Sequence, residues 1–345
     1  MTRLTLLRTA SVAAALSLGL SGCMAGENTA TGGNAAEAAT TGGTLNIDFA
    51  TYNPLSLVIK EQGWLEEELA DQDITVNWVQ SAGSNKANEA LRAGAIDVGS
   101  TAGSAALLAR SNGSPIKTIE IYSQPEWAAL VTSADSGITA VEDLRGKSVA
   151  ATKGTDPYFF LLQALESAGV DPAEVTVQNL QHADGRAALA NGAVDAWSGL
   201  DPIMAAAEQD GAELFYRNID FNSYGFLNAT ESFLEEKPDV AQTVVNAYEK
   251  AREWASDNPE DTAAILAEVA AIDPAVARSV ILERTNLDVD PVPGDAQLEV
   301  LEKIGPVFVE SGDVSSQEQV DTALGSLFDD SLVKKSDASA VGASS

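Results

Sequence analysis

The sequence has very few of the residues that bind metals or crosslink a chain. Its 345 residues include one cysteine and one histidine. A single cysteine cannot form a disulfide bond within the chain, and this pair cannot make a cysteine–histidine metal cluster. The Asp-x-Asp-x-Asp-Gly pattern of calcium-binding loops is also missing, although sites made only of carboxylates stay open. We therefore expect neither a metal site nor a cofactor.

Basic residues are scarce as well. Lysine and arginine number 20 against 51 aspartates and glutamates, which gives a net charge of −31. So acidic a surface repels nucleic acid and anionic lipid, and we expect no nucleic-acid partner. The net charge of the chain does not determine whether a small binding pocket is locally positive or negative.

Long hydrophobic runs are missing too, and the apolar stretch 10–20 is too short for a permanent membrane helix. It follows Arg3 and Arg8 and precedes "LSGC", which ends at Cys23. This arrangement is typical of a secretory signal peptide followed by a bacterial lipobox, in which the cysteine is lipidated. We predict a signal peptide over 1–22, lipidation of Cys23, and a lipid anchor on the extracytoplasmic face of the cell membrane. An ordinary signal peptide with an incidental cysteine is the alternative.

Two segments contain almost no large apolar residues. Residues 23–43, after the cysteine, are rich in Gly, Ala, Thr and Asn, as expected for a flexible tether. The C-terminal segment 333–345 has a similar composition, and we predict that it is disordered.

The folded part contains one phrase twice. "LRAGAIDVGS" at 91–100 and "LANGAVDAWS" at 189–198 share Leu-x-x-Gly-Ala-(Ile/Val)-Asp. Each phrase closes a β-α-β-α-β pattern. In the first pattern we expect strands at 44–50, 74–80 and 95–100 and helices at 54–69 and 85–94. In the second we expect strands at 147–154, 174–180 and 193–199 and helices at 156–169 and 183–192.

This repeat predicts an α/β protein of two similar lobes, each with a mostly parallel sheet flanked by helices. The repeated Asp97 and Asp195 stand at strand starts, and we expect both to be structural. After residue 220 the pattern becomes mostly helical, and these helices need an apolar surface, which the first lobe offers. Ligands in such folds bind at the carboxyl ends of strands, here in a cleft between the lobes.

Several segments in order carry a resemblance over residues 44–310: "GWLEEEL", "ALRAGAIDVGST", "VEDLRGKSVAATKG", "ALANGAVDAWSGLDP" and "SFLEEKPDVAQTVV". Together they resemble the substrate-binding proteins of ABC importers for aliphatic sulfonates, taurine and nitrate. The resemblance implies the two-lobed periplasmic-binding-protein fold of type II. It implies a first lobe of 44–126 and 225–332, a second lobe of 127–224, and hinge crossovers near 124–131 and 219–227.

The resemblance also implies a function. A monomer would capture a small molecule by hinge closure and deliver it to the permease and ATPase subunits of an importer, without catalysis. We expect the ligand to meet strand ends and crossovers, with Ser81 and Asn222 nearby. The expected ligand-binding residues are Tyr52, Asn53, Ser84, Ser100, Thr101, Glu126, Trp127, Thr155, Asp156, Tyr158, Trp197, Asp201 and Tyr224.

Trp197 has the clearest expected role among them, because an indole at a strand end gives a flat wall with one N–H donor. A core tryptophan is the alternative. Ser100 and Thr101 could receive an anion at a helix start, or could serve as plain N-caps.

Asp156 departs from the resemblance, since sulfonate binders usually carry small hydroxyl residues after Lys-Gly. Either Asp156 only caps the helix that begins at Pro157, or the pocket takes an amine or a neutral heterocycle instead of a sulfonate. Two further readings stay open. One is an enzyme on the same fold, although we expect His182 to be exposed and unsuited to base catalysis. The other is a ligand-sensing lipoprotein.

Overall fold

The structure is a computed structural model that describes residues 42–342. The predicted signal peptide, the lipidation cysteine Cys23 and nearly all of the predicted tether lie outside the described residues. None of the helices within 42–342 combines the length and the apolar character needed to cross a membrane.

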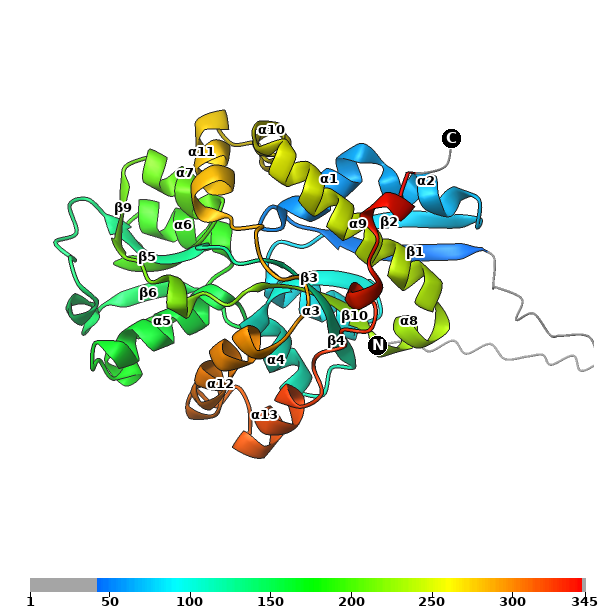
Figure 1. Cartoon of the computed structure of the whole chain (residues 1–345). Coiled ribbons are helices and arrows are strands. Elements are labelled where there is room, and N and C mark those ends of the chain that lie inside the picture. Colours follow the sequence, from blue (N-terminus) through cyan, green and yellow to red (C-terminus); the bar gives the residue numbers. More distant parts are fainter. Residues whose placement is uncertain (1–41, 343–345) are drawn as a thin grey trace, which may run out of the picture. The chain divides into compact units, whose positions relative to one another are not determined.

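A first five-stranded sheet draws its strands from two distant parts of the chain, in the order β2-β1-β3-β10-β4 (Figure 1). β1 pairs in parallel with β2 and β3, whereas β10 pairs antiparallel with both β3 and β4. The strands are β1 (Gly43–Phe49), β2 (Ile74–Gln80), β3 (Val98–Ala102), β4 (Ile116–Ser123) and β10 (Gly225–Thr230). We call this sheet and its helices the first lobe.

Helices from both parts of the chain cover this sheet. α1 and α2 pack with α9, and α9 also reaches β4; α3 and α4 pack on β3, with α12 and α13 against α4. The bounds are α1 (Pro54–Gln62), α2 (Trp64–Ala70), α3 (Ser84–Arg92), α4 (Gly103–Ser111), α8 (Glu231–Glu236), α9 (Pro238–Asp257), α10 (Pro259–Ala270), α11 (Pro274–Ser279), α12 (Asp295–Glu310) and α13 (Gln317–Leu324). A π-helical turn, Val280–Arg284, continues α11. Of the late helices, α9, α12 and α13 pack on the first lobe, whereas α11 also contacts α7 and α12 also contacts α5 of the second sheet.

The second sheet is contiguous in sequence and has the order β7-β6-β8-β5-β9. Its strands are β5 (Ala128–Ser133), β6 (Ser148–Ala151), β7 (Thr176–Asn179), β8 (Ala196–Leu200) and β9 (Ala212–Tyr216). α5 (Asp156–Ser167) packs on β5 and β8, and α6 (His182–Ala190) and α7 (Ile203–Gln209) also pack on this sheet and on each other. These green elements of Figure 1 form the second lobe. The chain passes between the sheets at 124–127, the first crossover, and at 217–224, the second crossover.

The repeated phrase makes the same corner in both lobes. The Asp97 carboxylate accepts a hydrogen bond from the backbone N–H of Asn46 in β1 at 2.8 Å. The Asp195 carboxylate accepts one from the backbone N–H of Ser148 in β6 at 2.7 Å. Each aspartate thus ties the last strand of its β-α-β-α-β pattern to the first strand of that pattern, β3 to β1 and β8 to β6. The structural role predicted for both is confirmed.

Two predicted segments need correction. The helix predicted over 54–69 is broken into α1 and α2, because Gly63 adopts a left-handed conformation with φ of 68° while the amphipathic pattern continues across it. The tail predicted to be disordered packs on the first lobe as far as residue 342. Val341 is buried, and its carbonyl accepts a hydrogen bond from Lys250 of α9 at 2.7 Å. A composition of small residues gave no sign of these tertiary contacts.

Candidate functional site

Asp156 is the centre of the hydrogen bonds that join the two lobes. It begins α5 in the second lobe, and its side chain is 1% exposed. Its Oδ1 accepts from the hydroxyls of Ser104 and Ser223, each at 2.6 Å. Its Oδ2 accepts from Trp127 Nε1 at 2.7 Å and from the Ser223 backbone N–H at 2.8 Å. One carboxylate therefore binds the start of α4 in the first lobe and both crossovers.

The cap expected of Asp156 is wrong. Thr155 is the N-cap residue of α5, and Pro157 lies in the first turn. The Thr155 hydroxyl donates to the Thr152 carbonyl at 2.6 Å rather than capping the helix. The sequence left two roles open for Asp156, a helix cap or a ligand-facing residue. The structure shows a third role, because the carboxylate turns away from its own helix and binds groups of the first lobe and the crossovers. Burial raises the pKa of Asp156, and its four hydrogen bonds oppose this rise.

A second buried carboxylate lies in the first lobe. Asp48, near the end of β1, accepts from the backbone N–H of Ser100 at 2.9 Å and from its hydroxyl at 3.1 Å. Burial raises the pKa of Asp48 to about 7. The hydroxyl of Tyr52 donates to the Ser100 carbonyl at 3.0 Å. Ser100, which was predicted to bind the ligand, thus donates its hydrogen bonds to Asp48 instead. Asp48 was not among the predicted residues.

Residues from both lobes, among them Tyr52, Trp127, Asp201 and Arg284, line an enclosed space of about 10 Å³, which has room for about one water molecule. The rings of Tyr52 and Trp127 meet edge to face, with centroids 6.0 Å apart. Arg284, which ends the π-helical turn after α11, pairs with Asp201 of the second lobe at 3.3 Å and also with Glu208. Burial raises the pKa of Asp201 to about 6, although the Arg284 charge opposes the shift. In this state no solute fits between these residues.

Trp197 does not reach this region, so the expected wall of the cleft is wrong. Its side chain is fully buried in the core beneath α6 and α7, where it contacts Gly185. Side chains alternate along β8, and Ser198 rather than Trp197 faces α5, where its hydroxyl donates to the Pro157 carbonyl at 2.6 Å. Both faces of β8 are covered, so the sequence pattern did not show which face turns to the other lobe.

Three other predicted residues hold the first lobe together. Asn53 caps α1 by accepting from the Ser56 backbone N–H, and its amide donates to the hydroxyl of Tyr248. The Ser84 hydroxyl accepts from the Ala102 backbone N–H at 2.9 Å. The Thr101 hydroxyl accepts from the Asn228 amide at 2.8 Å. All three side chains are buried and satisfied by the fold itself.

The crossovers carry two more of the predicted residues. Glu126 makes a two-pronged ion pair with Arg217, which joins the first crossover to the start of the second. Tyr224 is partly buried, and this burial raises its pKa, with a smaller contribution from the Glu299 charge. The amide oxygen of Asn222 accepts from the Ala128 backbone N–H at 2.8 Å, where β5 begins. These contacts brace the crossovers.

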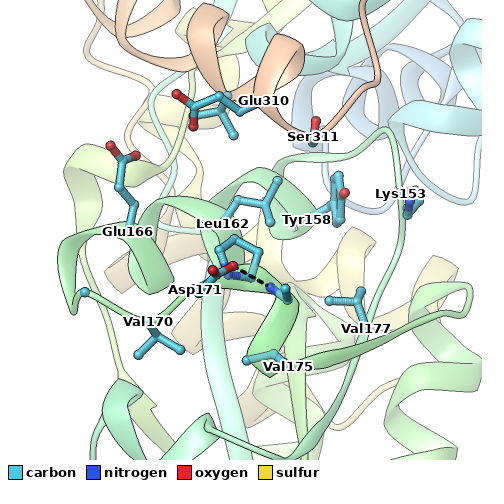
Figure 2. A pocket seen from close by; sticks show the side chains of 14 residues that line it. Lys153, Tyr158, Leu162, Glu166, Val170, Asp171, Val175, Val177, Glu310 and Ser311 are labelled. Carbon is cyan, nitrogen blue, oxygen red and sulfur yellow. Dashed lines mark hydrogen bonds between the residues drawn. The ribbon is translucent and has the colours of Figure 1, made fainter.

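A larger hollow opens beside the network, with a volume of about 810 Å³. Figure 2 shows Glu310 and Ser311 at the end of α12 on one side and Tyr158 and Leu162 of α5 on the other. Of the predicted ligand-binding residues, Tyr158 alone lines it. Its walls are largely apolar and it contains none of the Asp156 donors, so we place the candidate site at the Asp156 network rather than in this groove.

His182 is buried, which contradicts the expectation that it is exposed. It is 1% exposed and lies at the start of α6, where its Nδ1 is 3.2 Å from the Thr152 hydroxyl. Among the residues that the structure describes, its Nε2 finds no hydrogen-bond partner, and it lies against Gly83 of the first lobe. Burial lowers the pKa of His182 to about 4. The neighbouring lobe supplies part of this burial, which the sequence around His182 could not reveal.

This burial predicts a pH effect. Since the folded pKa lies below the ordinary 6.5, the stability that neutral His182 provides is present above pH 6.5 and is lost as the pH falls towards 4. Between pH 7 and 4.5 we expect wild type to lose about 2 kcal/mol more unfolding free energy than His182→Asn. Urea unfolding at both pH values measures this. Equal losses in the two proteins would contradict it.

Within residues 42–342 the structure brings together no group of three or more histidine, cysteine, aspartate or glutamate side chains suited to a metal ion. Three members of the site were not among the predicted residues. Ser104 lies three residues after the predicted Thr101, and Ser223 lies directly before the predicted Tyr224. Arg284 is distant in sequence from every motif, and no local signal could have found it.

The chain is similar in sequence to one protein family and to named proteins from two bacteria. The profile of the family described as NMT1/THI5 like matches residues 55–262. A protein of Bacillus subtilis (strain 168) named for binding aliphatic sulfonates is 29% identical over 235 residues, which are 67% of this chain and 70% of the relative. One of Escherichia coli (strain K12) with the same name is 30% identical over 220 residues, 63% of this chain and 69% of the relative.

Solved structures give the same result for the fold. The alkanesulfonate-binding protein SsuA from Xanthomonas axonopodis pv. citri, bound to MOPS, has a TM-score of 0.73 and 24% identity to this chain. The match covers 84% of this chain and 99% of that one. The predicted two-lobed type II fold is confirmed.

Proposed function

This chain belongs to the NMT1/THI5-like family, and from this membership we propose that it is the extracytoplasmic solute-binding protein of an ABC importer. It resembles the aliphatic sulfonate binders, as the sequence predicted. In the proposed role it captures a small sulfonate-like or related organic solute between its lobes and delivers it to the permease and ATPase subunits. The observation that carries the proposal is the set of buried polar groups from both lobes and both crossovers that meets at Asp156.

Capture requires the lobes to separate and close. The space of about 10 Å³ at Tyr52 and Trp127 admits no organic solute, so a solute has to enter a more open state. Two short crossovers, at 124–127 and 217–224, are suited to act as the hinge. A solute that contacts both lobes binds the closed state more tightly and shifts the population towards it.

The remaining parts of the proposal come from the sequence. We assign 44–126 and 225–332 to the first lobe and 127–224 to the second, and we keep Cys23 as the lipid anchor of an otherwise soluble monomer outside the cell membrane. The role is one of binding rather than catalysis, supported by the names of the relatives. A sensing lipoprotein would use the same capture step.

A second candidate differs only in the solute. Two buried carboxylates, Asp156 and Asp48, lie where the strand ends of the first lobe meet the second lobe and the crossovers. Buried carboxylates favour an amine or a neutral heterocycle over a sulfonate, because a second negative charge in the same low-dielectric space is repelled.

A ligand screen tests the proposed function. The protein from residue 41 onwards, whose described residues 42–342 belong to one compact unit, is mixed with alkanesulfonates, taurine, nitrate, aromatic sulfonates, amines and pyrimidines. A solute that binds only the native state raises the melting temperature by mass action. We expect at least one class to do so and to reduce the radius of gyration in small-angle scattering.

Trp127→Phe should weaken this effect, because it removes the Nε1 donor between the lobes. Trp78→Phe is the matched control, since the Trp78 Nε1 donates to Glu66 within the first lobe. If none of the classes shifts the melting temperature, the proposed function does not stand.

A further inference from the structure

The donors around Asp156 form a receptor for a small anion. Each carboxylate oxygen accepts two hydrogen bonds of 2.6–2.8 Å, from Ser104, Trp127 and Ser223. The Trp127 indole and the Ser223 backbone N–H can only donate. All three donor residues are at least nine-tenths buried. The set therefore requires an acceptor, and an oxyanion fits it best.

None of these donors comes from the segment that carries Asp156. Ser104 lies in the first turn of α4, Trp127 in the first crossover and Ser223 in the second crossover. α4 has nine residues, no acidic side chain in its first turn and no side-chain cap. Its positive end therefore receives its negative charge from the other lobe. Among the ion pairs of residues 42–342 none includes Asp156, so hydrogen bonds alone hold its carboxylate.

Two more buried hydroxyls lie near the second crossover. Within residues 42–342, Tyr122 Oη and Ser123 Oγ at the end of β4 make no hydrogen bond. The Tyr122 ring and Ser123 Oγ lie against Gly225, two residues after Ser223. Burial raises the pKa of Tyr122, and the charge of Asp156 contributes to the rise. The described part of the fold thus keeps unused hydroxyls close to the crossover that supplies Ser223.

We propose that Ser104, Trp127 and Ser223 form an anion subsite between the lobes and that this chain fills it with its own Asp156 carboxylate. The proposal rests on the proposed function and narrows its solute class. The solute of the unmodified chain brings no sulfonate or carboxylate to this subsite. It is an uncharged or amine-bearing molecule, and Asp156 acts as an internal substitute for the acidic group.

Chemical rescue tests the proposal. In Asp156→Ala the donors lose their acceptor, and methanesulfonate, acetate or formate can take its place. We expect methanesulfonate to bind Asp156→Ala at least roughly tenfold more tightly than wild type by calorimetry, because an orphaned set of buried donors gains a charged acceptor. Adding Ser223→Ala to Asp156→Ala should remove most of the gain.

Asp195→Ala is the matched control. Its carboxylate also accepts from a serine hydroxyl and backbone N–H, but away from the other lobe. Methanesulfonate should give it no gain. If Asp156→Ala does not fold, Asp156→Ser leaves a smaller space and a hydroxyl that the donors can reach.

Two results would overturn the proposal. One is tight binding of methanesulfonate by wild type that Asp156→Ala leaves unchanged. That result would leave the proposed function intact. The other is no gain in either Asp156 variant. The proposed function would then be judged on the wider ligand screen alone, so the two failures are distinguishable.

Discussion

Replacing Arg252 with methionine is expected to lower the free energy of unfolding by about 3–5 kcal/mol. Arg252 of α9 is largely buried and pairs with the fully buried Glu120 of β4 at 3.1 Å. It also pairs with Glu249 and donates to the backbone carbonyls of Ile121, Tyr122 and Leu287. Without the guanidinium, Glu120 loses its cation inside the protein and three carbonyls lose a donor. Urea unfolding at neutral pH gives the free energy.

A surface pair provides the control. Arg278 and Glu260 form an ion pair in which both side chains are more than half exposed, so Arg278→Met should cost less than about 1 kcal/mol. Combining Arg252→Met with Glu120→Leu should recover part of the loss, because the unpaired carboxylate is gone. An Arg252→Met loss no greater than that of Arg278→Met would contradict the prediction.

The stability of the first lobe should fall as the pH rises, and Asp48 should be the cause. The folded pKa of about 7 lies above the ordinary 3.8, so between these values the native state holds a proton that the unfolded state releases. The stabilisation is complete below pH 3.8 and is lost as the pH rises through 7. From pH 5 to 8 we expect wild type to lose about 3 kcal/mol relative to Asp48→Asn.

Asp48→Asn keeps the shape of the side chain, and its amide can donate to the Ser100 hydroxyl. The comparison therefore isolates the proton. Asp195→Asn is the control, because hydrogen bonds from Ser148 lower the pKa of Asp195 and it titrates below this range. Parallel pH profiles for wild type and Asp48→Asn would contradict the assignment.

Local sequence patterns predicted the α/β architecture well, because each helix–glycine–strand corner is encoded within about ten residues. Gly94 and Gly192 both have positive φ where the repeated helices end, and Asp97 and Asp195 then accept hydrogen bonds from β1 and β6, the first strands of the two repeated patterns. The same patterns continued across Gly63, where the helix breaks. A pattern of apolar residues reports which face is buried, and it does not report where the backbone turns.

The candidate site was predicted only in part. Asp156 stood out because its charge did not suit the start of a helix that should receive an anion. Its partners could not be found this way, since Ser104 lies 52 residues before it and Ser223 lies 67 residues after it. Trp197 failed for a related reason. Alternation along β8 gives two faces, and only the packing of α5 on one face and of α6 and α7 on the other decides where Trp197 lies.

The position of β10 sets an order of events for folding. β10 lies between β3 and β4 in the first sheet, so these two strands cannot complete their pairing until residues 225–230 exist. All five strands of the second sheet lie within 128–216 and precede β10. The chain is synthesised from its N-terminus. Once residue 216 has been made, the second lobe has all of its strands, while the first sheet still lacks β10. The half of the protein that begins first is therefore the half that is finished last.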